Sequence, residues 1–331
     1  MTVTRAAVKQ RAAVPTMMEA AAIDRFGPPA VLALRSVPVP KVGPTDVLIA
    51  LHAAGVGVWD ARIRDGTWAT GRERFLLVLG TDGAGIIAAR GARVRRFQLD
   101  DRVWAYEYAN PKGGFYAEYV AVKAEHVGRA PRRLDLLEAG AGAVTGLTAL
   151  QGVNLLRLRE GATVLIFGGS GAIGTLAIQI AKSCRARVLA TASGEDATAL
   201  VLGLGAEAAI DSRHQDAVDR LRALAPDGLD AILALAGGDA LERCIGLLRT
   251  GGRVVYPNGV EPEPRPRKGV RVVAYDATAD PRRFAELERV VDEAQLRVPI
   301  AAVYPLSEAA QAHARLEQGH VLGRIVLRID H

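Results

Sequence analysis

Cysteine is scarce in this sequence, which has only Cys184 and Cys244 among its 331 residues. Two cysteines so far apart form no disulfide framework, and they lack the close pairing of structural zinc sites. Both lie in apolar segments, so we expect both thiols to be buried. A reducing compartment is the expected setting, with the cytoplasm as the default.

Long apolar runs are also missing. Charged residues or glycine interrupt every apolar stretch before it reaches the roughly 18–20 residues that a membrane-spanning helix needs. Half of the residues are hydrophobic and 24% are charged, which is typical of a globular chain rather than a disordered one. We therefore expect a soluble protein of two domains with no membrane partner.

Acidic residues are absent from residues 1–16, which carry Arg5, Lys9 and Arg11. This segment has no apolar core of the kind found in signal peptides. We interpret residues 1–16 as a flexible N-terminal tail.

A continuous basic stripe is absent as well, although the net charge is +6 and the isoelectric point is about 9.5. Basic residues alternate with acidic ones, apart from a short run at 265–268 that we interpret as an exposed loop. We therefore expect no nucleic-acid partner. The six histidines show no metal-ligand spacing, so they receive no chemical role.

The N-terminal part of the sequence contains short strand-like segments separated by glycines and prolines. They lie at 20–24, 47–53, 83–89, 102–105 and 119–122. Short strands at this spacing indicate a partly open barrel rather than a parallel sheet.

From about Ala139 the pattern changes to buried strands that alternate with helical segments. The strands are predicted at 162–167, 186–191, 208–211, 231–235 and 253–256. Strict alternation predicts an α/β fold with a doubly wound parallel sheet.

The C-terminal part departs from that alternation. It predicts a strand at 270–275, helices at 281–295 and 308–318, and a closing strand at 324–329. We expect this end to return to the barrel, which makes the first domain discontinuous.

A glycine-rich turn follows the first strand of the parallel sheet. Gly169, Gly171 and Gly174 have the G-x-G-x-x-G spacing, and Ser170, Ala172 and Ile173 complete the turn. A turn that follows an apolar strand and opens a helix is typical of dinucleotide binding, with helix amides facing the pyrophosphate. We assign the tight turn to Gly169, the approach of the pyrophosphate to Gly171, and close helix packing to Gly174.

The preference between NAD and NADP is indicated by the residue about 20 positions after the glycine turn. NAD-binding sites usually have an acidic residue there. Here Ser193 follows the next strand and leaves room for a 2′-phosphate, so NADP(H) is the predicted cofactor. Arg213 is a candidate partner for that phosphate, or an exposed loop arginine. Glu195 and Asp196, which follow closely, weaken the argument.

Several ordered motifs together make the sequence resemble the zinc-independent, quinone oxidoreductase-like branch of the medium-chain dehydrogenase/reductase superfamily. The resemblance covers nearly the whole chain, from Met18 to Ile329. Besides the glycine turn, the motifs are AGVGVWDARIRDG at 54–66, GTDGAG at 80–85, FQLDDRV at 97–103, GGFYAEY at 113–119, GLTA at 146–149 and YPLSEAA at 304–310.

The resemblance implies a GroES-like β-barrel catalytic domain at 17–143 and 279–331 and a Rossmann NADP(H)-binding domain at 144–278. It implies a nicotinamide cleft between them, contacted by Thr145 and Thr148. Asn258 and Gly259, at the carboxyl edge of the sheet, are further cofactor candidates. All four have an alternative role as helix-cap or turn residues. Homodimers built by an edge strand, here 270–275, are also implied.

Zinc-dependent relatives of this superfamily use a cysteine ligand and a Gly-His-Glu motif. This chain has no cysteine before Cys184, and Gly80, Thr81 and Asp82 stand where Gly-His-Glu would be. A tetrahedral site with nitrogen and sulfur ligands cannot be assembled from these residues, so no metal is predicted.

Candidate catalytic residues lie on the segment that the resemblance places along the cleft: Asp60, Arg62 and Trp68. Asp60 has an alternative role as a helix cap or salt-bridge partner, and Trp68 as a packing residue. Gly57 replaces an asparagine that many relatives have, which leaves the proton donor open. The sequence does not choose among Tyr106, Tyr108, Tyr116 and Tyr119.

These observations favour metal-free, NADPH-dependent reduction of quinones or α,β-unsaturated carbonyls, because such substrates need no Lewis acid. One alternative is an enoyl reductase in a biosynthetic pathway. Another is a non-catalytic NADPH-binding sensor or nucleic-acid-binding protein.

Overall fold

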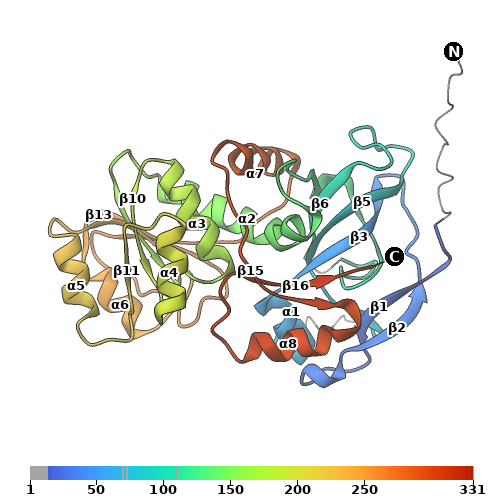
Figure 1. Cartoon of the computed structure of the whole chain (residues 1–331), viewed down its shortest axis with the longest axis horizontal. Helices are drawn as coiled ribbons and strands as arrows, with labels where there is room; N and C mark the ends of the chain where they lie inside the picture. The colour runs from blue at the N-terminus through green and yellow to red at the C-terminus, as the bar shows by residue number, and fades with distance from the viewer. Residues whose placement is uncertain (1–13, 69–70, 72–73, 109, 331) are drawn as a thin grey trace, which may run out of the picture.

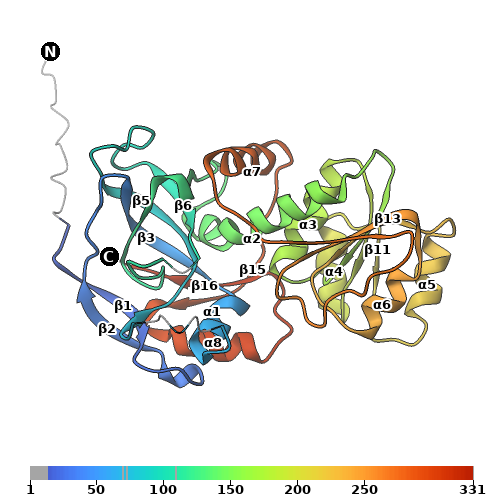
Figure 2. The same ribbon diagram turned by 180° about the vertical axis from the view of Figure 1, so that it is seen from behind.

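The computed structural model describes residues 14–330 except 69, 70, 72, 73 and 109. It has two lobes, joined along a long central helix (Figures 1 and 2). Most of the predicted N-terminal tail, residues 1–13, lies outside the described residues. Among the described residues, no helix is both long and apolar enough to cross a membrane.

One lobe is built mainly from antiparallel strands in two sheets, with the orders β2-β1-β4 and β15-β16-β3-β5-β6-β8; β7 also pairs with β3. The five strands that the sequence predicts in the N-terminal part are present, whereas β2, β4, β8 and β15 were not predicted. The strands are β1 (Met17–Ile23), β2 (Ala33–Pro38), β3 (Asp46–Val56), β4 (Leu77–Val78), β5 (Asp82–Arg90), β6 (Arg102–Tyr106), β7 (Tyr119–Lys123), β8 (Val127–Arg129), β15 (Ile300–Pro305) and β16 (Arg324–Arg328).

Strand β3 is the hub of this lobe. It pairs antiparallel with β5, β7 and β16, and ten of its eleven residues are buried. Because β16 lies beside β3, the C-terminal segment is part of the same sheet as the N-terminal strands. The sequence pattern predicts this return of the chain.

The other lobe contains a six-stranded sheet with the order β11-β10-β9-β12-β13-β14, parallel throughout. The predicted doubly wound fold is confirmed, and the strand at 270–275 forms the edge. The strands are β9 (Thr163–Phe167), β10 (Arg187–Thr191), β11 (Ala208–Ile210), β12 (Leu229–Ala234), β13 (Leu248–Pro257) and β14 (Arg271–Tyr275).

Helices α3 to α6 pack around the parallel sheet, whereas α7 and α8 accompany the barrel strands (Figures 1 and 2). The helices are α1 (Val58–Asp65), α2 (Leu136–Leu156), α3 (Ala172–Ser183), α4 (Glu195–Gly203), α5 (Ala217–Leu224), α6 (Asp239–Ile245), α7 (Pro281–Glu293) and α8 (Ala309–Glu317), with short 3₁₀ turns η1 (Pro29–Val31), η2 (Ala124–His126) and η3 (Leu306–Glu308).

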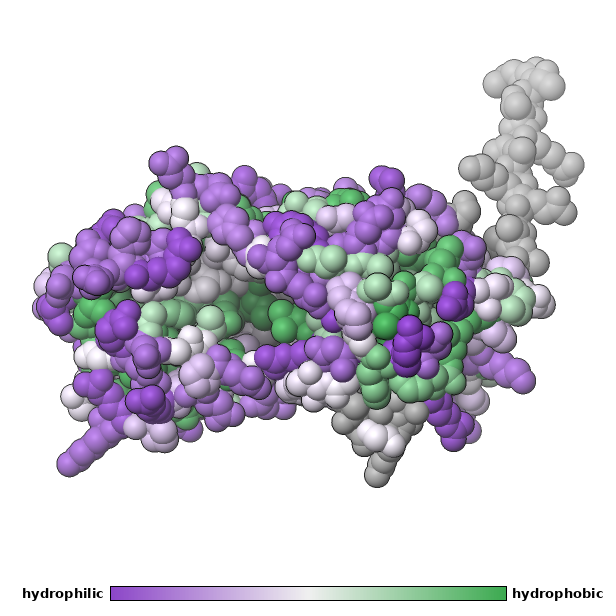
Figure 3. Space-filling view, turned by 90° about the horizontal axis from the view of Figure 1, so that it is seen from below, coloured by the Kyte–Doolittle hydropathy of each residue, from purple (hydrophilic) through white to green (hydrophobic). Residues whose placement is uncertain are grey.

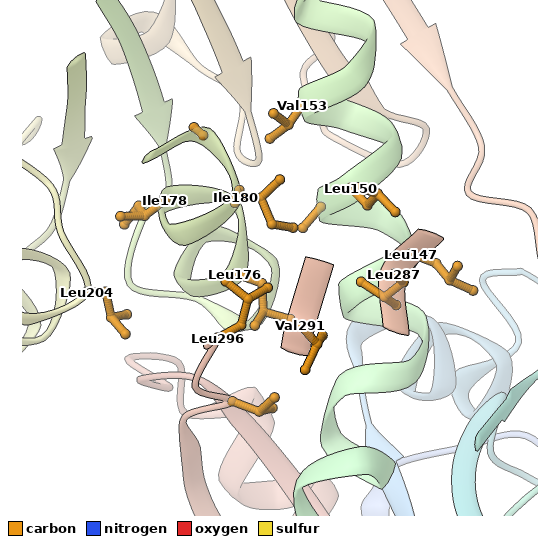
Figure 4. Packing of buried hydrophobic residues seen from close by; sticks show 14 of the residues in the cluster. Leu147, Leu150, Val153, Leu176, Ile178, Ile180, Leu204, Leu287, Val291 and Leu296 are labelled. Atoms are coloured by element: carbon orange, nitrogen blue, oxygen red, sulfur yellow. The ribbon is translucent and has the colours of Figure 1, made fainter. Parts of the chain in front are cut away.

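Helix α2 connects the two lobes. Its start is fixed by a reciprocal pair, in which Asp135 accepts from the amide of Glu138 at 2.8 Å and Glu138 accepts from the amide of Asp135 at 2.9 Å. Figure 4 shows Leu147, Leu150 and Val153 of this helix in the core shared with α3 and α7. The helix is buried on nearly all sides and therefore has no amphipathic pattern. For this reason it was not predicted from the sequence.

The two cysteines have different surroundings. Cys244 is buried as predicted, but Cys184 is exposed, so that expectation was wrong. Cys184 is the C-cap of α3, shortly before the chain enters β10.

Candidate functional site

A cavity of about 730 Å³ lies between the two lobes. Figure 3 shows the molecule from below, with a hollow between the lobes that has hydrophobic residues on its floor. Both lobes contribute to the lining, which comprises Val58, Trp59, Arg62, Trp68, Thr81, Tyr106, Tyr108, Val144, Thr148, Ile173, Leu235, Ala236, Gly237, Pro257, Asn258, Gly259, Val260, Glu261, Tyr275, Asp276 and Ala277.

The glycine turn lies between β9 and α3, next to this cavity, which Ile173 lines. The residue with positive φ is Gly168, at +90°, so the tight turn that we assigned to Gly169 belongs to its neighbour. Gly169 has a steric role instead, since a Cβ there would lie 2.9 Å from the Cβ of Ala190. At Gly174 a Cβ would lie 2.2 Å from the carbonyl oxygen of Gly168, so the helix packs too closely for any side chain.

Gly171 differs from these two because it faces open space. A Cβ there would meet only the carbonyl oxygen of Gly168, at 3.7 Å. Gly171 is also the N-cap of α3, whose first amides point out of the helix end. An open glycine in front of free amides fits a pyrophosphate, so the residues present suit a dinucleotide.

The barrel lobe touches this turn through Gly323. Its amide donates to the carbonyl oxygen of Ser170 at 3.0 Å, and Gly323 forms an isolated bridge with Gly171. The segment between α8 and β16 therefore borders the glycine turn.

Ser193 and Arg213 come together at the ends of β10 and β11, although 20 residues separate them. The Ser193 hydroxyl donates to Asp211 at 3.1 Å, and Arg213 makes two bonds to the same carboxylate, at 3.0 and 2.7 Å. These bonds hold the pKa of Asp211 well below its usual range, with the largest contribution from Arg213. Asp211 thus neutralises the arginine that we expected beside a 2′-phosphate.

The remaining predicted cofactor contacts lie at the junction of the lobes. Thr145 and Thr148 are buried in α2, where their hydroxyls donate to the carbonyl oxygens of Ala141 and Val144 at 2.8 Å each. Of the two threonines, Thr148 lines the cavity.

Asn258 and Gly259 both line the cavity, on the loop after β13. The Asn258 amide donates to Asp276 at 2.7 Å, and Gly259 has φ of +91°. Both residues therefore contribute to the shape of the loop as well as to the cavity wall.

Aromatic rings form the barrel-side wall of the cavity. Trp59 and Trp68 meet edge to face with ring centroids 4.1 Å apart, and Tyr108 stands 6.3 Å from Trp59. Arg62 lies 5.6 Å from the centre of the Trp68 ring and donates to the carbonyl oxygen of Gly259 at 3.4 Å. The residues Arg62 and Trp68, predicted from the sequence, are thus brought together at the cavity.

Asp60 lies on the same helix but is directed away from the cavity. Its side chain is fully buried in the barrel, where it accepts from the amide of Gly57 at 2.8 Å. Asp60 does not line the cavity, because position 60 is on the inner face of α1 and positions 59 and 62 are on the outer face. The alternative role as a helix-capping residue describes its contacts.

Asp60 belongs to a buried group of charges. Arg324, from β16, donates to Asp82 at 2.9 Å, and Asp82 also accepts from the amide of Val144 at 3.1 Å. The pKa of Asp60 is raised to about 7, mainly by burial; the charge of Arg324 lowers it and the charge of Asp82 contributes to the rise. Burial also raises the pKa of Asp82.

The chemistry of this group differs from that of a zinc site. Side chains at positions 55 and 57 would meet the Arg324 guanidinium, since a Cβ at Gly57 would lie 2.9 Å from Nη1. Two carboxylates beside a fixed guanidinium supply neither the nitrogen nor the sulfur ligands of a zinc site, and a second cation there would be repelled. The residues present therefore do not fit zinc, and no three His, Cys, Asp or Glu side chains in the described part of the chain gather as metal ligands.

A second buried network holds α1 in place. Arg64 donates to Nδ1 of His313 at 3.1 Å, and Nε2 of His313 lies 3.1 Å from the Tyr116 hydroxyl. Burial lowers the pKa of His313 to about 3, so the ring is neutral. An arginine can only donate, so the proton of His313 lies on Nε2 and points to Tyr116.

Sequence reasoning missed Trp59 and Arg324. Trp59 stands next to a predicted residue, and only its position on the outer face of α1 shows that it lines the cavity. Arg324 begins the predicted closing strand, but its partner Asp82 is 242 positions away. No local signal connects the two.

Two family models match: "Alcohol dehydrogenase GroES-like domain" over residues 43–132 and "Zinc-binding dehydrogenase" over residues 204–327. The chain is 33% identical to the quinone oxidoreductase of Lama guanicoe, covering 94% of this chain and 97% of that protein. Identity to the human quinone oxidoreductase is 31%, over 94% and 98% of the two chains.

Solved structures agree with these matches. The quinone oxidoreductase from Coxiella burnetii has a TM-score of 0.82 at 30% identity, covering 95% of this chain and all of the other. An NAD-dependent alcohol dehydrogenase has a TM-score of 0.88 at 30% identity, with the same coverage. A mycobacterial protein in complex with NADPH has a TM-score of 0.83 at 25% identity, covering 94% and 99% of the two chains.

Proposed function

Because the chain belongs to the quinone oxidoreductase family of medium-chain dehydrogenases/reductases, we propose that it reduces quinones or α,β-unsaturated carbonyl compounds with NADPH and without a metal. The observation that carries the proposal is the cavity between the lobes. It has a glycine turn suited to a dinucleotide beside it and an aromatic wall formed by Trp59 and Trp68.

The nicotinamide, when bound, supplies a hydride. The residues of the chain do the rest. Gly171 lets the backbone approach the pyrophosphate, while Gly169 and Gly174 let the turn and the helix pack closely. Thr148 and Ile173 line the cavity on this side. We propose that the other predicted cofactor residues also contact the dinucleotide. They are Thr145, Ser170, Ala172, Asn258 and Gly259.

The substrate half of the site is the aromatic wall. Trp59 and Trp68 offer flat apolar surface to a flat ring, and Arg62 stands between that wall and the loop after β13. Asp60 acts from inside the barrel by fixing the start of α1, so we assign it no contact with substrate. Quinones and enones suit this site because their reduction needs a hydride and a proton but no Lewis acid.

The preference for NADPH rests on Ser193 and Arg213. A hydroxyl residue at the end of β10 leaves space for a 2′-phosphate, and Arg213 is exposed beside it. Asp211 opposes this preference, since it holds the guanidinium and repels phosphate. A 2′-phosphate therefore has to share Arg213 with Asp211, which predicts a moderate preference.

Three further parts of the proposal concern the surroundings of the protein. The edge strand β14 is the surface that we propose for homodimer formation, because its outer side has no neighbouring strand in the sheet. The cytoplasm is the proposed compartment, since both cysteines are unpaired. A small molecule is the proposed substrate, and no membrane or nucleic-acid partner is included.

The test is oxidation of NADPH and NADH by the purified protein with a panel of quinones and enones. We expect turnover with NADPH and a lower kcat/KM with NADH. The matched variant Arg213→Ala should lose about tenfold in NADPH affinity, by the typical strength of a charge-assisted bond, and change little with NADH. No oxidation of either cofactor by any member of the panel would overturn the proposal.

A further inference from the structure

Tyr106 is the last residue of β6 and is paired with Asp82 of β5. Its half-buried side chain lines the cavity together with Thr81 and Val144. Because β6 belongs to the barrel, the ring contributes to the barrel side of the cavity.

The structure shows which tyrosines line the cavity, a question that the sequence left open. Tyr116 is fully buried with its hydroxyl against His313, and Tyr119 does not line the cavity. Tyr275 does line it, but its hydroxyl donates to the carbonyl oxygen of Thr148 at 2.7 Å. The exposed Tyr108 stands at the edge of the aromatic wall.

The Tyr106 hydroxyl makes no hydrogen bond to any residue that the structure describes, although Tyr106 lines the cavity. A half-buried hydroxyl that faces a cavity without a protein partner is available to a ligand. It can donate to a carbonyl oxygen, which is the polar atom shared by quinones and enones.

The charges near Tyr106 determine which form of the hydroxyl is present. Burial raises the pKa of Tyr106 well above its usual value, and Asp82, Asp276, Tyr108 and Asp60 raise it further. The phenol therefore stays protonated and acts as a donor. The same carboxylates repel negative charge at this point, so a carbonyl oxygen that gains charge during reduction depends on a hydrogen-bond donor beside it.

We propose that Tyr106 donates a hydrogen bond to the carbonyl oxygen of the substrate and stabilises the negative charge that develops there during reduction. This inference rests on the proposed function. In an enone, the hydride from the reduced nicotinamide bonds to the β-carbon, and the electron pair of the C=C bond moves toward the carbonyl oxygen. A proton from solvent then bonds to the α-carbon, and Tyr106 keeps its own proton throughout.

The test compares the wild type with Tyr106→Phe, which removes the hydroxyl and keeps the ring. Loss of one donor to a developing oxyanion typically costs 100-fold or more, so we expect kcat for enones to fall on the order of 100-fold. The Kd for NADPH should stay within about twofold, because the hydroxyl faces the substrate. Tyr119→Phe is the control, since it removes the same group from a tyrosine outside the cavity.

Two further readouts separate a donor from a packing residue. The loss in Tyr106→Phe should grow across a series of enones with increasingly basic carbonyl oxygens, which a merely structural defect would not produce. A hydroquinone product, which has oxygens but undergoes no turnover with NADPH, should bind at least fivefold more weakly to the variant in a titration of tryptophan fluorescence.

The outcomes distinguish this inference from the proposed function. Turnover by the wild type with equal kcat in Tyr106→Phe overturns the role of Tyr106 and leaves the function standing. Absence of turnover in the wild type overturns the function, and the hydroquinone titration then decides the role of Tyr106. Equal binding to both proteins, or no binding to either, overturns that role.

Discussion

The two walls of the cavity are built in opposite ways. On the parallel-sheet side, the glycine turn uses backbone and close packing, and the charged pair Asp211 and Arg213 lies at an outer edge. On the barrel side, buried charges lie directly behind the wall, with Arg324 between Asp60 and Asp82. The first wall needs the absence of side chains, whereas the second needs particular side chains in particular protonation states.

This difference predicts where each kind of substitution acts. Changes on the parallel-sheet side should alter cofactor binding and leave the fold intact when they face open space. Changes behind the barrel wall should alter stability and its dependence on pH, because buried charges must be balanced.

The largest expected effect is on the barrel side, in Arg324→Met. Removing the guanidinium leaves Asp82 buried without its partner, which typically costs about 3–5 kcal/mol of unfolding free energy. Chemical denaturation measures this loss. The double variant Asp82→Asn with Arg324→Met should recover part of it, and equal instability of the single and double variants would contradict the pairing.

The next effect is on the parallel-sheet side, in Gly171→Val. The side chain would enter open space where the pyrophosphate is proposed to lie, so NADPH affinity should fall on the order of 100-fold, or about 2.7 kcal/mol. The unfolding midpoint without cofactor should stay close to that of the wild type. Ser170→Ala is the control for altering the turn without adding bulk, and unchanged affinity in Gly171→Val would show that the cofactor lies elsewhere.

The smallest of the three effects concerns the pH dependence of stability. The pKa of Asp60 is raised from 3.8 to about 7, so its protonated form adds stability that is complete below pH 3.8 and lost as the pH rises through about 7. Between pH 5 and 7.5 this amounts to about 2.5 kcal/mol, because the slope of roughly 1.4 kcal/mol per pH unit applies only up to the folded pKa near 7.

Asp60→Asn should remove that contribution and keep an acceptor for the Gly57 amide. Its stability relative to the wild type should therefore rise by about 2.5 kcal/mol from pH 5 to 7.5. Thermal unfolding at several pH values checks this, and Asp65→Asn, at an exposed position of the same helix, is the control. Parallel pH profiles for Asp60→Asn and the wild type would show that Asp60 is ionised throughout this range.

The difference between the two walls also explains which of their features could be predicted from the sequence. The glycine turn could be predicted because its strand, turn and helix are adjacent in the sequence, and local spacing carries the information. The sequence assigned the tight turn to Gly169, whereas the glycine with positive φ is Gly168, because spacing does not reveal which glycine bends the chain. Long helix α2 was missed because burial on nearly all sides removes the helical periodicity of polar residues.

By itself, the sequence determined the doubly wound sheet, the return of the C-terminal strand to the barrel, and the family. These depend on patterns within short segments or on ordered motifs. Only the tertiary structure placed Arg324 against Asp82, directed Asp60 inward and Arg62 outward, and brought Tyr106 into the wall of the cavity. Those facts depend on how β5, β6 and β16 lie in one sheet and on which face of α1 packs against it, and contacts between distant segments leave no local pattern.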